Sequence, residues 1–442
     1  MMRMIMMWMM WIIGIVGVGV LGWGIDPASL TAQSPMSGTT VTRSTDYRLQ
    51  GIAIARPHVI PGPSGGSVVG VATAGTYRRT VLVTPITDPT IVCSIATVAD
   101  QDLQYVHVAS WSDDTGNSVL VWNDPKAGTV SFVRRAATGR IGTPITLWDQ
   151  RESFPVEPAI TRLTDGRFLV VWRAAGIDGR LRYRVGTPDA ASWSDPQIVH
   201  PTPGYRSPIS LTAPRSGDPI AWLTYTAHQP THPDPTRRVQ TCLVPWNGTT
   251  FTDPEPIAVP EGSLVDATIR RDPVQDRLVI GGRIVDRGIV VVMRPASAAP
   301  TTPWTTVHAV WDRTAESPML AYDASGDLHL TWTAGEPLVR TVFYRLIHRD
   351  GWMSSDVPSV NAAPFFGATV LPPEDPFAPT RTVTVAYALV FGTTGTVNTR
   401  IMQITVQSEP TVAPPPPPAG PYHLWIPIVM RTSGWGVGWE GC

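Results

Sequence analysis

Apolar and polar positions alternate with a period of two in short stretches of residues 317–360. Leu328–Trp332 and Thr341–Ile347 show the alternation most clearly, and the turn residues Ala324–Gly326 and Arg349–Gly351 separate such stretches. Period-two patterning bounded by Gly, Asp and Pro is typical of strands joined in hairpins. The segment therefore predicts a meander of four short antiparallel strands.

The same pattern recurs along the chain, and its clearest mark is an apolar second strand that ends in an aromatic residue. Trp122, Trp172 and Trp222 follow one another at intervals of 50 residues, and later copies end at Trp332 and Tyr387. A four-stranded repeat of this period is typical of a β-propeller blade. We therefore predict an all-β chain in which residues 67–407 form a six-bladed propeller, and we expect the repeated aromatic rings to pack between neighbouring blades. Additional strands over Ser67–Thr73 and Arg79–Thr84 leave seven blades open as an alternative. One copy departs from the mark and has Gly281-Gly282 in the place of the aromatic residue.

A closed ring needs a last strand, because an open ring would leave unpaired strand edges. The last repeat ends before a proline-rich stretch, and Thr87–Val92 resembles the fourth strand of the other repeats. We therefore expect residues between Tyr77 and Val92 to complete the last blade.

The segments outside the repeat differ in composition. Residues 1–32 carry Arg3 and then a long apolar run, which predicts a secretory signal peptide, with an uncleaved N-terminal anchor as the alternative. Residues 33–66 are rich in Ser, Thr, Pro and Gly and are interpreted as a linker with one strand near Leu49–Ala55. Residues 408–421 form a proline-rich linker and 422–442 a tail with a short apolar strand. These features predict a secreted or cell-surface protein of bacterial type.

Charge and cysteine content exclude several classes of function. The 34 basic and 35 acidic residues give a net charge of −1, which offers no electrostatic footprint for nucleic acid. The three cysteines have no metal-ligand spacing, and His228 and His232 lie in a proline-rich segment that cannot be a helix. We expect no metal and no cofactor, and contact with a membrane only through the N-terminal segment if it stays uncleaved.

The repeat resembles the sialidase-like superfamily of propellers, most closely over Glu157–Val199 and Ser317–Val360. Thr187–Trp193 approaches the Asp-box motif of that superfamily but lacks its Gly and is one residue short, so the Asp-boxes are degenerate. Ala55-Arg56-Pro57 is the only echo of the Arg-Ile-Pro motif of catalytic sialidases, and their arginine triad cannot be placed. The resemblance implies the fold and a glycan-related role.

Candidate functional residues fall in the loops that enter the inner strands and in the connections between second and third strands. These loops lie on one face of a propeller, around its axis, where ligands commonly bind. Two carboxylates there could act as acid and base in glycoside cleavage, and arginines could hold an acidic sugar. The alternative is that they are solvated loop charges, which every propeller of this size carries. The ligand-binding candidates are Arg151, Glu157, Arg173, Arg206, His228, Asp266 and Glu316.

The sequence favours a non-catalytic module at the cell surface that binds a glycan or a surface protein. An exo-acting, sialidase-like glycoside hydrolase for acidic sugars is one alternative, and a structural envelope protein is another. The hydrolase would need at least two arginines and a carboxylate that converge on one pocket. Nothing in the sequence fixes the oligomeric state.

Overall fold

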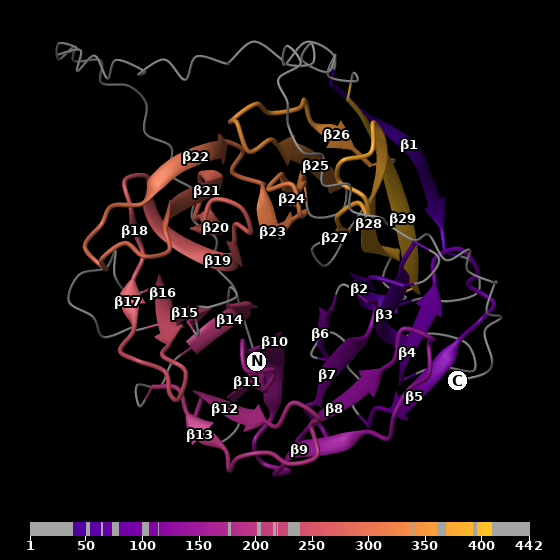
Figure 1. Ribbon diagram of the computed structural model, residues 1–442, viewed down its shortest axis with the longest axis vertical. Coiled ribbons are helices and arrows are strands. Elements are labelled where there is room, and N and C mark those ends of the chain that lie inside the picture. The colour runs from indigo at the N-terminus through magenta and orange to yellow at the C-terminus, as the bar shows by residue number, and fades with distance from the viewer. Residues whose placement is uncertain are drawn as a thin grey trace, which may run out of the picture. The chain divides into compact units, whose positions relative to one another are not determined.

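The computed structural model describes residues 39–49, 54–62, 65–72, 79–99, 106–113, 115–175, 178–200, 205–214, 218, 220–228, 239–336, 340–359, 368–391 and 396–408. The described strands form seven antiparallel sheets that stand as blades around a common axis (Figure 1). This arrangement confirms the predicted all-β propeller, with the alternative count of seven blades. All described residues belong to one compact unit of the chain, Ser34–Cys442.

The main strands of each blade follow one another from the propeller axis outward. Blade 1 contains β2 (Ile54–Ile60), β3 (Ser67–Ala72), β4 (Thr80–Pro85) and β5 (Cys93–Thr97), blade 2 contains β6 (Val108–Ser112), β7 (Ser118–Asp124), β8 (Thr129–Arg135) and β9 (Ile145–Asp149), and blade 3 contains β10 (Pro155–Arg162), β11 (Phe168–Ala174), β12 (Arg180–Gly186) and β13 (Gln197–Ile198). Blade 4 contains β14 (Tyr205–Thr212), β15 (Ala221–His228), β16 (Val239–Trp246) and β17 (Glu255–Pro256), and blade 5 contains β19 (Gly262–Arg271), β20 (Arg277–Ile284), β21 (Gly288–Pro295) and β22 (Thr305–Val310), with the short β18 (Ala258–Val259) paired to β19. Blade 6 contains β23 (Glu316–Tyr322), β24 (Leu328–Ala334), β25 (Thr341–Ile347) and β26 (Val357–Pro358), and blade 7 contains β27 (Thr369–Leu371), β28 (Thr380–Phe391), β29 (Thr396–Gln407) and β1 (Thr40–Arg48).

The position of a strand within its blade explains its hydrophobic pattern. The second strands β3, β7 and β24 are buried at every residue, because the neighbouring blades cover both faces of each sheet. Third strands such as β25 alternate buried and half-buried positions. Outer strands are short or polar, as β13 and β1 show. The second and third strands therefore carry the periodic signal that reveals the repeat.

The core consists of apolar clusters between neighbouring blades. Trp172 packs with residues of blades 2 and 3, Trp332 with residues of blades 5 and 6, and Tyr387 with residues of blades 6 and 7. All three rings are at most 1% exposed. Trp122 lies in the corresponding cluster between blades 1 and 2. The predicted packing of these rings between blades is confirmed.

Blades 4 and 5 depart from this arrangement. Trp222 packs toward blade 5 instead of blade 3, and strand register puts Tyr225 at the place that Trp172 occupies in blade 3. The alignment of Trp222 with the other tryptophans is therefore wrong by three residues. In blade 5, Gly282 stands at the aromatic position, and a Cβ there would lie 2.6 Å from the Leu264 side chain. Leu264 thus fills the space that a ring fills in other blades.

The ring is closed by β1, which pairs with β29 from Thr40↔Gln407 to Arg48↔Arg400. The expectation that residues 77–92 complete the last blade is wrong, because Thr80–Pro85 is the third strand of blade 1. Residues 33–66 contain β1 and β2 instead of a linker with one strand near Leu49–Ala55. The sequence pattern does not reveal β1 as a strand, because an outer strand that is exposed along most of its length needs no alternation of apolar and polar residues.

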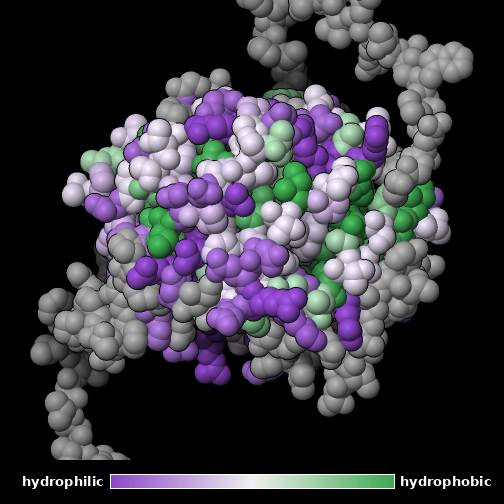
Figure 2. All heavy atoms as spheres, turned by 90° about the horizontal axis from the view of Figure 1, so that it is seen from below, coloured by the Kyte–Doolittle hydropathy of each residue, from purple (hydrophilic) through white to green (hydrophobic). Residues whose placement is uncertain are grey.

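The surface combines hydrophilic regions with separate hydrophobic patches, as one side of the ring shows (Figure 2). Within the described ranges, no helix is long and apolar enough to cross a membrane. The proposed signal segment, the proline-rich linker after Ser408 and the C-terminal tail lie outside these ranges.

Candidate functional site

A cavity of about 1090 Å³ runs along the propeller axis. The innermost strands of all seven blades line it, namely β2, β6, β10, β14, β19, β23 and β27. We call this cavity the axial channel. The end where the chain enters each inner strand, and where second strands turn into third strands, is called the entry face, and the opposite end is called the exit face.

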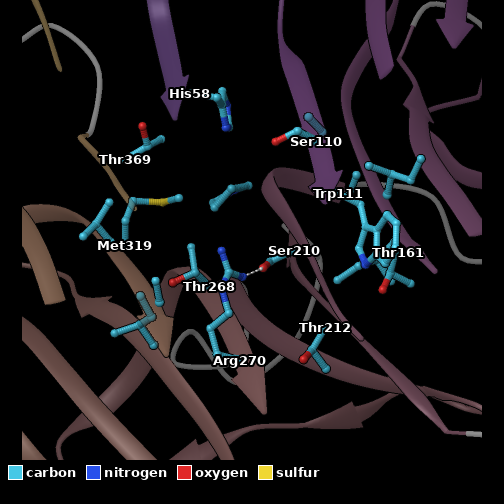
Figure 3. A pocket seen from close by; sticks show the side chains of 18 of the residues that line it. His58, Ser110, Trp111, Thr161, Ser210, Thr212, Thr268, Arg270, Met319 and Thr369 are labelled. Atoms are coloured by element: carbon cyan, nitrogen blue, oxygen red, sulfur yellow. Dashed lines mark hydrogen bonds between the residues drawn. The ribbon is translucent and has the colours of Figure 1, made fainter. Parts of the chain in front are cut away.

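The strand register arranges the side chains of the axial channel in successive levels. Most of the labelled side chains belong to Ser or Thr and carry a hydroxyl group, and they come from blades that surround the axis (Figure 3). One level contains His58, Ser210, Thr268, Met319 and Thr369, and the next contains Trp111, Thr161, Thr212 and Arg270. A ligand in the channel would therefore meet hydroxyl groups and one guanidinium group, together with a larger apolar surface to which Trp111 and Met319 belong.

Arg270 extends from β19 into the middle of the axial channel (Figure 3). Its Nη1 donates to the Ile269 carbonyl oxygen at 2.7 Å and to Ser210 Oγ at 3.3 Å. No salt bridge joins it to a carboxylate of any described residue. Burial lowers the pKa of Arg270 to about 10, so the guanidinium group stays charged at neutral pH. Arg270 is therefore a cation whose hydrogen-bond partners within the described residues are neutral oxygen atoms.

Two carboxylates of the channel near the entry face are in ion pairs. Asp266 Oδ2 lies 3.0 Å from Arg283 Nη2, and Glu316 is bound by Arg340. Strand register puts Glu157 of blade 3 at the position of Asp266, and Arg173 at that of Arg283.

The acidic positions near the entry face depend on an unusual backbone. Glu157 and Asp266 have φ of 53° and 52°, and Ser317 has 54° at the corresponding bulge of β23. Left-handed backbone is uncommon for residues other than Gly and often accompanies functional sites. Repetition in three blades indicates that the bulge is a feature of the repeat.

Toward the exit face, the charged groups that line the channel are again neutralised. Arg271 is only 6% exposed at its side chain and contacts Asp218 and Asp276, each at 2.6 Å. Asp323 has a fully buried side chain that accepts from Ser325 and lies 3.4 Å from His329 Nε2. These groups stabilise turns and blade contacts.

The structure brings together three of the seven predicted site residues. Glu157, Asp266 and Glu316 all line the axial channel. Arg151, Arg173 and His228 are not among its lining residues. Arg206 lies in β14, but its side chain is outside the described part of the structure.

Sequence reasoning missed Arg270, because it searched loops and Arg270 lies inside a strand. The segment Ala267–Asp272 places two adjacent arginines in an inner strand. A charged residue in the interior of an otherwise buried strand is the signal that could have found it.

Comparison with known proteins adds support for the fold. No protein-family model and no curated protein sequence matches the chain. Among solved structures, a fungal alcohol oxidase in complex with copper is 11% identical, with 83% of this chain and 76% of that chain covered and a TM-score of 0.52. An ulvan lyase, a polysaccharide lyase, is 9% identical, with 78% and 93% covered and a TM-score of 0.47. The lectin of Aleuria aurantia is 12% identical, with 67% and 91% covered and a TM-score of 0.46. Similarity at these levels of identity concerns the propeller architecture only.

Proposed function

We propose that this chain is an exported, non-catalytic glycan-binding module, and that an acidic sugar binds in the axial channel with its anionic group on Arg270. The observation that carries this proposal is the guanidinium group of Arg270, which projects into the channel without a carboxylate partner among the described residues. A desolvated charge is costly unless an opposite charge compensates it. A carboxylate or sulfate group of a ligand would supply that charge and could accept two parallel hydrogen bonds from the guanidinium group.

The remaining channel surface suits the rest of a sugar. Ser110 and Thr212 present hydroxyl groups to the channel, which can both donate to and accept from sugar hydroxyl groups (Figure 3). Thr369 Oγ1 donates to the Pro57 carbonyl oxygen at 2.9 Å, so it can only accept from a sugar. The cavity volume of about 1090 Å³ is at the upper end of the range for small-ligand sites, so it suits a ligand larger than a monosaccharide.

Binding is favoured over hydrolysis because Asp266 and Glu316 each hold an arginine. An acid–base pair for glycoside cleavage needs carboxyl groups that can reach the substrate, and each of these two carboxylates is already engaged by an arginine side chain. Arg271 is likewise occupied by two aspartates, so it does not join Arg270 in holding a ligand carboxylate.

The sialidase-like character of the repeat is part of this proposal. The hairpin after β12 supports it, since Asp189 Oδ1 accepts from Thr187 Oγ1 at 2.5 Å and from the Ala191 backbone N–H at 3.1 Å. The Trp193 ring covers Gly186, where a Cβ would lie 2.8 Å from it. The residues that resemble an Asp-box thus make the hydrogen bonds and the ring contact that stabilise this hairpin.

Calorimetric titration of the secreted protein with sialylated, uronate-containing, sulfated and matched neutral oligosaccharides tests the function. We expect binding of one acidic class, and Arg270→Gln should weaken it about 10- to 150-fold, the value of a charge-assisted hydrogen bond. Arg140→Gln, at an exposed arginine outside the channel lining, should leave binding unchanged. Equal affinity for neutral sugars, or an unchanged Arg270→Gln variant, would overturn the proposal. Release of free sugar during the titration would favour the hydrolase instead.

Export is tested separately by cell fractionation and by N-terminal sequencing of the secreted protein. We expect the protein outside the cytoplasm, with its first residue near Gln33, because the apolar run follows a positive N-terminus. A cytoplasmic protein that retains Met1 would contradict this part of the proposal.

A further inference from the structure

Trp311 differs from the other tryptophans of the described residues because it is mostly exposed. Its relative exposure is 59%, whereas Trp172, Trp246 and Trp332 are at most 1% exposed. Val285, in the turn between β20 and β21, is also exposed, at 48%. An exposed indole ring offers a flat apolar face, with one polar N–H, to a ligand or partner.

Val285 and Trp311 both lie at the entry face of blade 5. Ile289 pairs with Val310 in the sheet, so the turn before β21 meets the chain that leaves β22. A Cβ on Gly288 would collide with the Val310 carbonyl oxygen, which shows how closely these backbones approach. Trp311 and the turn that carries Val285 therefore lie at the same end of neighbouring strands, and we call these residues the Trp311 surface.

The Trp311 surface lies at the same end of the propeller as the mouth of the axial channel. Asp266 and Arg283 lie at the channel end of the same blade, and the turn with Val285 and the exposed Asp286 follows outward. From β19 to β22 there are three strand spacings, which amount to about 14 Å. A sugar chain that leaves the channel at the entry face would cross polar groups and then reach the indole ring.

We propose that the Trp311 surface is an outer subsite for the glycan, where a pyranose ring stacks on the indole of Trp311 while the acidic sugar lies at Arg270. This inference rests on the proposed function. It names the ligand as an oligosaccharide, because a monosaccharide in the channel cannot span the distance to Trp311. The apolar face of a sugar ring suits a flat, partly hydrated indole, and the polar Asp286 beside it can accept from sugar hydroxyl groups.

The test is a titration of acidic oligosaccharides of increasing length against three variants. Trp311→Ala should weaken binding of long chains about tenfold and leave the shortest bound ligand unchanged, whereas Trp311→Phe should keep part of the affinity. Phe377→Ala is the matched control, because Phe377 is 73% exposed but lies at the exit face, between β27 and β28. It should bind every ligand as the wild type does.

The outcomes separate the two proposals. If Arg270→Gln weakens all lengths but Trp311→Ala weakens none, the outer subsite is wrong and the channel site stands. If the wild type binds no acidic glycan of any length, both proposals fall. A concentration-dependent dimer in sedimentation that Trp311→Ala abolishes, with glycan binding unchanged, would assign the Trp311 surface to protein contact and overturn the subsite.

Discussion

The closing strand β1 depends on one buried carboxylate, and its removal gives a direct test of how the ring is held together. Asp46 has a side chain that is 1% exposed. Its carboxylate accepts from Tyr387 Oη at 2.9 Å and from Arg400 Nε at 2.9 Å. Both donors belong to blade 7, so Asp46 joins the N-terminal strand to the C-terminal strands of the same sheet.

The cost of Asp46→Ala follows from these contacts. The variant loses hydrogen bonds between a charged acceptor and two donors, each of which contributes about 1.5–3 kcal/mol. Tyr387 is fully buried and keeps a hydroxyl group without this acceptor, whereas Arg400 is 23% exposed at its side chain and can regain water. We therefore expect the free energy of unfolding to fall by about 3 kcal/mol.

Urea denaturation measures the total loss, and limited trypsin digestion reports whether β1 detaches locally. Arg43 and Arg48 lie within β1, so transient opening of this strand exposes two cleavage sites. Asp46→Ala should be cut there faster than the wild type. The control is Thr45→Ala, since exposed Thr45 only donates to Gln403 Oε1 at 3.0 Å and should change stability by less than about 0.5 kcal/mol. Equal stability and equal cleavage rates for the two variants would refute the role of Asp46 in closure.

Two further predictions concern the seams between blades. Gly282→Ala should lower the free energy of unfolding by about 1–3 kcal/mol in urea titrations, because the added Cβ would lie 2.6 Å from Leu264, and a variant as stable as the wild type would contradict this packing. The pKa of His308 is lowered from its ordinary 6.5 to about 4, mainly because the ring is buried and also because the charged Arg345 lies close to it. Arg345 Nη1 is 2.8 Å from His308 Nε2. Below pH 6.5 the unfolded chain therefore binds a proton at His308, whereas the folded chain binds it only near pH 4. The free energy of unfolding should fall by about 3 kcal/mol through this group as the pH drops from 6.5 to 4. Urea titrations across this range should show a shallower pH dependence for His308→Gln, and an unchanged slope would contradict the assignment.

The candidate site was only partly predictable from the sequence. Glu157, Asp266 and Glu316 were found because residues that enter inner strands gather around the axis of any propeller. Arg270 was not found, because the sequence does not show that its side chain reaches the channel instead of a seam between blades. That distinction depends on the bulge near Asp266, which shifts the register of β19.

The sequence by itself determined the all-β meander, its period and the aromatic rings at the seams, because these features depend on local alternation and on burial of both faces of the second strands. The tertiary structure decided the number of blades, the strand that closes the ring and the equivalence of Tyr225 with Trp172. These features depend on contacts between residues far apart in the chain. Asp46 and Arg400 are an example, since neither carries a local pattern that points to the other.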